Sequence, residues 1–179
     1  MLSVENTLLV VIDLQERLMP IINDTEKLEN KCEIFIKGCR LLDISILTTQ
    51  QYTKGLGETI PSIKNALGDF EPIEKIAFSC YGDSGFVKKL HEIGKNDILI
   101  VGIEAHICVQ QTVLEMLDNG YNVYVIADCI GSRIETDREY ALERMKQAGA
   151  VLTTAESMLF ELLKTADHPK RKEISHLVK

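Results

Sequence analysis

The chain has 179 residues, of which 45% are hydrophobic and 26% charged, and it contains 11 Gly and 4 Pro. This composition excludes collagen-like and disordered classes, and the length predicts a single domain over residues 1–179. The longest uninterrupted apolar run, residues 8–12, is far shorter than the ~20 residues of a transmembrane helix, so no membrane-spanning segment is expected.

Asp and Glu outnumber Lys and Arg by 27 to 20, which gives a formal net charge of −7. An acidic surface repels phosphate backbones, so nucleic-acid binding is not expected. The first six residues include no Lys or Arg, and no targeting segment is predicted. The cysteine count is odd and no CxxC spacing occurs, which argues against a disulfide framework and favours a reducing, cytoplasmic environment. The five cysteines are Cys32, Cys39, Cys80, Cys108 and Cys129.

Taken in chain order, the apolar pattern alternates between the periods of strands and helices. A continuous aliphatic run over 7–12 predicts a strand buried on both faces. Helical spacing follows over 28–42, and then strands are predicted over 44–49 and, more weakly, 73–78. The remaining predicted elements are a helix over 86–93, a strand over 97–103, a helix over 108–119, a strand over 121–127, a helix over 136–148, a strand over 151–153 and a helix over 156–163.

Strands that alternate with helices of this length pair in parallel through right-handed crossovers. We therefore predict an α/β fold, with three α/β/α layers around an open, six-stranded, mostly parallel sheet. The sheet is expected to be Rossmann-like, with the strand order 3-2-1-4-5-6. Ligands of such sheets bind beyond the carboxyl ends of the strands, so the residues that follow each strand are the candidates for a functional site.

Cys108 stands where the strand over 97–103 gives way to a helix. The positive end of a helix dipole stabilises a thiolate, and free N–H groups there can bind an oxyanion. Most free cysteines are instead buried and inert, which is how we interpret Cys32 and Cys39 on one face of a helix. Position does not decide between the two interpretations, because Cys129 also follows a strand.

Asp13 ends a fully apolar strand, so its carboxylate is either a general base or a group that caps a turn. Lys75 lies in the weak strand over 73–78. If it is buried it needs a counter-ion, which Asp13 on a neighbouring strand could supply. If Lys75 instead lies on an exposed edge strand, it needs no counter-ion, and the spacing of the residues alone slightly favours this exposed position.

Several segments of the chain carry a family resemblance, and they are 11–15 (VIDLQ), 51–57 (QYTKGLG), 75–80 (KIAFSC), 101–112 (VGIEAHICVQQT), 120–123 (GYNV), 127–128 (AD) and 155–163 (AESMLFELL). They resemble the isochorismatase-like cysteine hydrolase superfamily, to which nicotinamidases and N-carbamoylsarcosine amidase belong, and above all its isochorismatase domain-containing branch. Each segment alone is weak evidence, but the set occurs in the family order between residues 7 and 178, and that order is specific.

The resemblance implies a catalytic triad of Asp13, Lys75 and Cys108, and it replaces the exposed interpretation of Lys75. In the family scheme the thiolate attacks a carbonyl or imine-like carbon and an amine leaves. Water then hydrolyses a thioester-type intermediate while the aspartate carries protons. The lysine keeps the aspartate ionised and the thiol acidic. The oxyanion is expected on the backbone N–H groups of Glu104 and Cys108, beside a cis Ile103–Glu104 peptide bond.

Departures from the family pattern bear on the substrate. Metal-dependent nicotinamidases carry an Asp-x-His cluster where this chain has 50–52 (QQY), and the four histidines here are scattered. The resemblance therefore implies no metal or other cofactor and disfavours nicotinamide. Isochorismatase itself lacks the nucleophilic cysteine, so Cys108 argues against that reaction. By location, four residues are candidates for substrate binding, with ordinary structural roles as the alternative: Gln15, Gln51, Tyr52 and His106.

The leading hypothesis is a cysteine hydrolase that cleaves a C–N bond in a small amide or ureide. A catalytically silent binding or scaffold protein with the same fold is the alternative. A dinucleotide-binding oxidoreductase is poorly supported, because no GxGxxG follows the first strand. The resemblance also implies a homo-oligomer, a dimer or larger, because members of the family commonly form such assemblies. Apolar residues surround much of the helix over 156–163, which fits either a homo-oligomer or a cover formed by the tail over 168–179.

Overall fold

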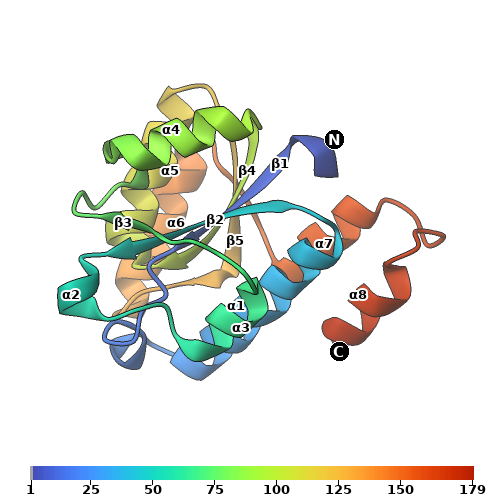
Figure 1. Cartoon of the computed structure of the whole chain (residues 1–179), viewed down its shortest axis with the longest axis horizontal. Coiled ribbons are helices and arrows are strands. Elements are labelled where there is room, and N and C mark those ends of the chain that lie inside the picture. Colours follow the sequence, from blue (N-terminus) through green and yellow to red (C-terminus); the bar gives the residue numbers. More distant parts are fainter. Residues whose placement is uncertain (1) are drawn as a thin grey trace.

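The computed structural model describes residues 2–179 as three layers, with a sheet between two sets of helices (Figure 1). The six strands form one sheet in the order β3-β2-β1-β4-β5-β6. The predicted order is confirmed, and every strand pairing is parallel. The strands are β1 (Thr7–Ile12), β2 (Ser45–Gln51), β3 (Ile73–Lys75), β4 (Asp97–Ile103), β5 (Asn122–Gly131) and β6 (Val151–Thr153).

Helices cover both faces of the sheet, and each face has its own buried apolar cluster. Helices α1, α3, α7 and α8 contribute to one cluster, and α4, α5 and α6 contribute to the other (Figure 1). Among residues 2–179, no helix combines the length and the apolar character needed to cross a bilayer. The helices are α1 (Thr25–Leu41), α2 (Thr53–Leu56), α3 (Pro61–Leu67), α4 (Ser84–Ile93), α5 (Gln110–Asp118), α6 (Glu135–Gln147), α7 (Ala155–Leu163) and α8 (Arg171–Leu177).

Strand β1 is the central element that positions the candidate site. All six of its residues are buried, and from Leu8 to Ile12 successive side chains alternate between the two apolar clusters. Such continuous burial is typical of a parallel strand covered on both faces. The register places Ile12 beside Thr49 of β2 and Gly102 of β4, so the residues that follow these strands emerge together at one edge of the sheet.

Several elements differ from the predicted ones: β5 runs on to Gly131 rather than ending at residue 127, and α2 and α3 were not predicted. Strand β3 ends at Lys75, not at Phe78, because the chain curls there and the ammonium of Lys75 hydrogen-bonds the carbonyl of Phe78 (3.0 Å). The tail forms α8, and its Ile174 is fully buried in the same cluster as the apolar residues of α7. The tail does not, however, form the cover of α7 that one of the two sequence-based alternatives requires, because α8 packs against α1 and the apolar side of α7 packs against α1 and β5.

Gly102 allows β4 to lie close to the end of β1. Its φ angle is 129°, which side chains rarely adopt, and a Cβ atom there would lie 2.1 Å from the carbonyl oxygen of Ile12. Any side chain at this position would push β4 away from β1 just before Asp13. The residue is therefore a glycine both for conformational freedom and for space.

Replacing Gly102 by alanine is expected to lower the free energy of unfolding by about 3 kcal/mol or more, because backbone strain and a backbone clash act together. Gly120→Ala is the matched control, since its φ of 83° is also unfavourable but no atom lies within 4 Å of the added Cβ. That variant should lose only about 1 kcal/mol. Urea denaturation measures both, and equal losses would contradict the argument from close approach.

Candidate active site

The site is built around a buried ion pair between the ends of β1 and β3. Lys75 is the last residue of β3, and its Nζ lies 2.6 Å from Oδ2 of Asp13, which directly follows β1. Both side chains are 0% exposed. The exposed position that spacing favoured for Lys75 is therefore wrong, and the two residues are partners.

Hydrogen bonds hold both members of the pair in place. Thr49 of β2 donates its hydroxyl to Oδ1 of Asp13 (2.7 Å), and Asp13 itself adopts a left-handed conformation with a φ of 53°. Lys75 donates to Oε1 of Gln51 (2.7 Å) as well as to the carbonyl of Phe78. A buried ion pair needs such additional bonds, because desolvation costs each ion several kcal/mol.

The ammonium of Lys75 keeps its proton in this environment. Burial acts to lower the pKa of Lys75, but the carboxylate of Asp13, aided by the thiols of Cys80 and Cys108, outweighs this and raises the pKa above its ordinary value. Lys75 is therefore an ammonium, and it is the counter-ion of the buried Asp13 side chain.

Cys108 lies in a π-turn, Ala105–Val109, that joins β4 to α5. Two N–H groups of the turn donate to the carbonyl of Glu104, at 3.1 and 3.2 Å. The helix predicted to begin at Cys108 therefore starts earlier, as this π-turn, and becomes α-helical only at Gln110. Such π-turns are frequent at functional sites because they re-aim the side chains they carry.

The thiol of Cys108 is protonated at neutral pH. Burial raises its pKa most, and Asp13 raises it further through its charge and a hydrogen bond. Lys75 acts in the opposite direction, and the resulting pKa of Cys108 is about 12. Lys75 therefore acts in the expected direction, but burial and Asp13 outweigh it, and the thiol is not acidic, contrary to what the family resemblance implies. The same contacts put the sulfur next to a carboxylate that can accept its proton.

The side-chain amides of Gln15 and Gln51 are engaged by the protein itself. Gln15 donates to the carbonyls of Gln51 and Gly57 and accepts from the N–H of Gln51. Gln51 accepts from Lys75 and donates to the carbonyl of Ile76 (2.7 Å). Sequence location suggested that both residues bind substrate, but these contacts make them parts of the frame that holds β2, β3 and Lys75 in position.

Tyr52 and His106 retain accessible surface at the same edge of the sheet. Tyr52 is 48% exposed, and its ring packs against Gly55, where a Cβ would lie 2.2 Å from the ring. His106 lies in the π-turn, with Nδ1 3.0 Å from the hydroxyl of Ser132 and Nε2 3.8 Å from a carboxylate oxygen of Asp137. His106 therefore makes the contacts expected of a structural histidine, whereas much of the Tyr52 side chain is exposed to solvent.

Glu104 supplies one of the backbone groups expected to bind an oxyanion. The Ile103–Glu104 peptide bond is cis, as the family resemblance implies. The carboxylate of Glu104 accepts hydrogen bonds from the backbone N–H and from Nε of Arg133, at 3.1 and 3.0 Å. These contacts fix the segment between β4 and the π-turn, which carries both Glu104 and Cys108.

Sequence reasoning assigned no role to Thr49 or Thr112. The hydroxyl of Thr112 donates to the carbonyl of Cys108 (2.6 Å) and accepts from the N–H of Cys80 (2.9 Å). Thr49 could have been found from the parallel register, because it lies opposite Ile12, one residue before Asp13. Thr112 carried no signal, since a threonine one helical turn after a cysteine is common in any buried helix.

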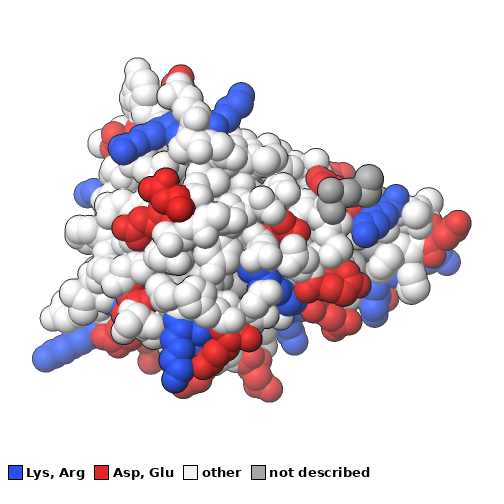
Figure 2. Space-filling model, turned by 90° about the horizontal axis from the view of Figure 1, so that it is seen from above, with Lys and Arg blue, Asp and Glu red and all other residues white. Residues whose placement is uncertain are grey.

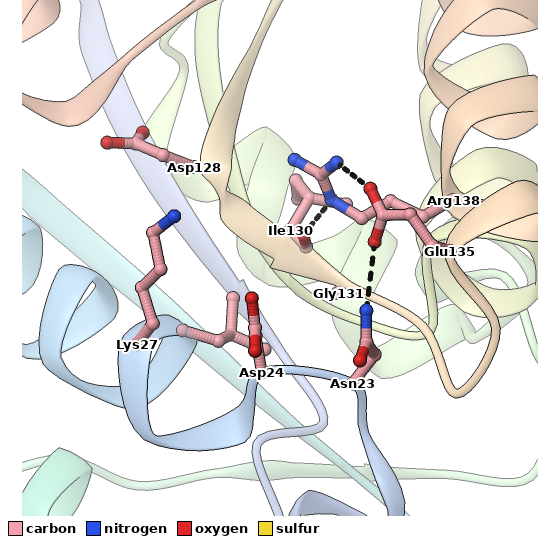
Figure 3. A pocket seen from close by; sticks show the side chains of 9 residues that line it. Asn23, Asp24, Lys27, Asp128, Ile130, Gly131, Glu135 and Arg138 are labelled. Atoms are coloured by element: carbon pink, nitrogen blue, oxygen red, sulfur yellow. Dashed lines mark hydrogen bonds and ion pairs between the residues drawn. The ribbon is translucent and has the colours of Figure 1, made fainter.

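A separate cavity of about 310 Å³ lies among the start of α1, the end of β5 and α6 (Figure 3). There Glu135 accepts hydrogen bonds from Asn23 and Arg138, and Arg138 also donates to the carbonyl of Ile130. The residues that line this cavity do not include the Asp13–Lys75 pair. Within residues 2–179, no three His, Cys, Asp or Glu side chains converge in a way that could hold a metal ion.

Comparison with known protein families gives one clear result. The model named Isochorismatase domain matches residues 7–157 of this chain. The chain belongs to the isochorismatase family. This membership agrees with the resemblance found in the sequence motifs, and it brings with it the three-layer fold described above.

Several known proteins are similar to this chain over nearly the whole of its length. Isochorismatase domain-containing protein 2A from Mus musculus is 38% identical over 176 residues, covering 98% of this chain and 84% of that protein. The structure of MAR1 ribonuclease from Caenorhabditis elegans superposes with a TM-score of 0.92 at 38% identity, covering 99% and 91%. The YcaC gene product of Escherichia coli, described as an octameric hydrolase of unknown specificity, gives a TM-score of 0.88 at 25% identity, covering 98% and 86%.

The raised thiol pKa values predict a loss of stability in alkali. A thiol in the unfolded chain ionises near pH 9, whereas Cys80 and Cys108 have pKa values of about 12 in the folded protein. Across this window the unfolded chain releases protons that the folded chain retains, so the free energy of unfolding falls as pH rises. Urea denaturation from about pH 8 to about pH 11 should show the decline, with a shallower slope in Cys80→Ala. A flat profile would contradict the assignment of buried, protonated thiols.

Proposed function

We propose that this chain is a cysteine-dependent hydrolase that cleaves a C–N bond in a small amide or ureide through a thioester-type intermediate. The observation that supports it most strongly is the fully buried Asp13–Lys75 pair beside the thiol of Cys108. Buried charges are costly, and an ion pair placed next to a nucleophile is typical of a catalytic site. Family membership supports a hydrolase in general terms.

The first half of the reaction is general-base-assisted attack. Because the pKa of Cys108 is raised to about 12, the thiol does not ionise before it reacts. Asp13 takes the proton as the sulfur bonds to the substrate carbonyl carbon, and the carbonyl oxygen becomes an oxyanion. The backbone N–H groups of Glu104 and Cys108 stabilise this oxyanion. Asp13 then passes its proton to the departing nitrogen as the C–N bond breaks, which leaves an acyl group on sulfur.

The second half uses the same carboxylate on water. Asp13 removes a proton from the water molecule that attacks the thioester carbon, and returns it to the sulfur when the acid product leaves. Throughout, Lys75 holds its proton and stabilises the carboxylate form of Asp13. Lys75 itself transfers no proton. The proton that Asp13 takes from the thiol or from water is the one that moves during the reaction.

The four candidate binding residues divide into two pairs in this proposal. Tyr52 and His106 contact the substrate, because both keep accessible surface near the site. Gln15 and Gln51 act as positioning residues, because their amides bind the backbone and Lys75. No metal or other cofactor takes part in any step.

Cys108→Ala is expected to reduce C–N hydrolysis by at least about 1,000-fold, because it removes the attacking atom. The assay follows release of ammonia or amine from a panel of small amides and ureides. Cys39→Ala is the matched control, since Cys39 is also a buried cysteine but lies in the cluster on the other face of the sheet, and it should retain activity. Undiminished turnover in Cys108→Ala would overturn the mechanism. Binding of panel members without turnover would favour the silent binding protein instead.

RNA cleavage is a second candidate, because a structure with a TM-score of 0.92 is that of a protein named MAR1 ribonuclease. The net charge of −7 opposes it. On the described part of the face in Figure 2, Lys and Arg are interspersed with Asp and Glu and form no continuous basic band. An RNA arm of the same assay separates the two functions, and RNA cleavage that disappears in Cys108→Ala would make RNA the substrate.

We also propose that the chain forms a homo-oligomer, as the octameric YcaC product does. Helix α7 offers little surface for this, because its apolar side packs against α1 and β5 and Phe160 is its one residue among the exposed large hydrophobic side chains of the described chain. Ile134 and Tyr140, which are 60% and 68% exposed, place apolar surface at α6 instead. Sedimentation velocity should show an assembly larger than a monomer, and Tyr140→Glu should weaken it. Monomers at micromolar concentration would contradict this proposal.

A further inference from the structure

Cys80 is a second buried thiol at the candidate site, and the proposed mechanism leaves it without a role. It follows β3 by five residues and begins a short 3-10 turn, Cys80–Gly82, with no exposed surface. It belongs to the same apolar cluster as Cys108. The other three cysteines, Cys32, Cys39 and Cys129, lie in the cluster on the opposite face of the sheet.

Two threonine hydroxyls tie Cys80 to the catalytic groups. Thr112 accepts a hydrogen bond from the N–H of Cys80 (2.9 Å) and donates one to the carbonyl of Cys108 (2.6 Å), so one hydroxyl joins the two backbones. Thr49 lies 3.8 Å from the sulfur of Cys80 and donates to the carboxylate of Asp13 (2.7 Å). The hydroxyl of Thr112 therefore joins Cys80 to Cys108, and that of Thr49 joins Cys80 to Asp13.

Both thiols also respond to the same charges. After burial, which is the main cause, Asp13 raises the pKa of Cys80 and of Cys108, and Lys75 lowers both. The charge of Cys80 also contributes to the raised pKa of Cys108. The Thr112 hydroxyl that joins their backbones and the apolar cluster that they share place the two cysteines side by side, and all five cysteines of the chain are free thiols.

We propose that Cys80 is a resolving cysteine, which forms a reversible disulfide with Cys108 after a hydroperoxide has oxidised Cys108. The inference rests on the proposed function in one respect, namely that Cys108 is the reactive sulfur beside a base. It adds an oxidative modification of the site, with hydrogen peroxide or another small hydroperoxide as the oxidant.

The chemistry proceeds in two balanced steps. Cys108 gives its proton to Asp13 and its sulfur attacks the peroxide oxygen, so the O–O bond breaks, a sulfenic acid forms and water leaves. The sulfur of Cys80 then attacks the sulfenic sulfur, the S–O bond breaks, and the hydroxyl departs with a proton as a second water. Two thiols are oxidised to one disulfide while one peroxide is reduced to two waters.

The location of Cys80 determines what this disulfide protects. Cys108 retains 7% of its residue surface whereas Cys80 has none, so Cys108 is the cysteine of the two that a small peroxide reaches first. Condensation with an adjacent thiol stops the oxidation of Cys108 before the irreversible sulfinic acid forms. The disulfide removes the nucleophile, and a dithiol reductant restores it. Cysteines on the other face of the sheet cannot compete, since the sheet lies between them and Cys108.

The test treats the folded protein with one equivalent of hydrogen peroxide, blocks remaining thiols with an alkylating reagent, and measures intact and peptide masses. In the wild type we expect the loss of two hydrogens, a peptide in which residues 80 and 108 are linked, and full reversal by dithiothreitol. In Cys80→Ala, and in Cys80→Ser as a second variant, we expect Cys108 to gain two oxygens that dithiothreitol does not remove. Cys129→Ala is the buried control and should behave as the wild type does.

Three results would overturn the inference: sulfinic acid at Cys108 without the linked peptide, a link from Cys108 to another cysteine, or unchanged thiols after peroxide. The mass readout needs no turnover, so it separates this inference from the proposed hydrolase. If the linked peptide forms but the protein hydrolyses no amide, the disulfide proposal stands and the hydrolase proposal is rejected. If the protein hydrolyses amides but no linked peptide forms, the hydrolase proposal stands and the disulfide proposal is rejected.

Discussion

The burial of an ammonium and a carboxylate against each other is the constraint on which this site depends. Neither Asp13 nor Lys75 has exposed surface, so each needs the other and each needs further hydrogen bonds. Thr49 and Gln51 on β2, which lies between β1 and β3 in the sheet, supply them. The three neighbouring strands thus end in one polar network, and removal of any member leaves a buried charge or dipole without its partner.

That network also decides the protonation state of the sulfur. An ammonium alone would make the neighbouring thiol acidic, but here the lysine is neutralised by a carboxylate that is itself close to Cys108. Burial and the carboxylate together keep the proton on the sulfur. In the proposed mechanism Asp13 therefore takes the proton during attack, and burial together with Asp13 likewise raises the pKa of Cys80.

Much of the fold follows from local pattern. Alternating apolar runs and helical spacing located all six strands and implied parallel pairing, because only parallel sheets bury consecutive residues such as Leu8 to Ile12 on both faces. The end of β3 was misplaced, because its course after Lys75 is set by that residue's own hydrogen bonds to distant groups and to the turn. The π-turn before α5 was likewise missed, since its carbonyl acceptor at Glu104 leaves no periodic signal.

For the site, the order of predicted strands already indicated which strand ends carry chemically useful groups, and among them were Asp13 and Cys108. Family resemblance, not spacing, selected Lys75. The burial of Lys75 against Asp13, the raised pKa of the Cys108 thiol and the link from Cys80 to Cys108 became visible only in the folded chain. The physical reason is that burial and charge depend on neighbours far apart along the chain, 62 residues in the case of Asp13 and Lys75, and no local pattern records them.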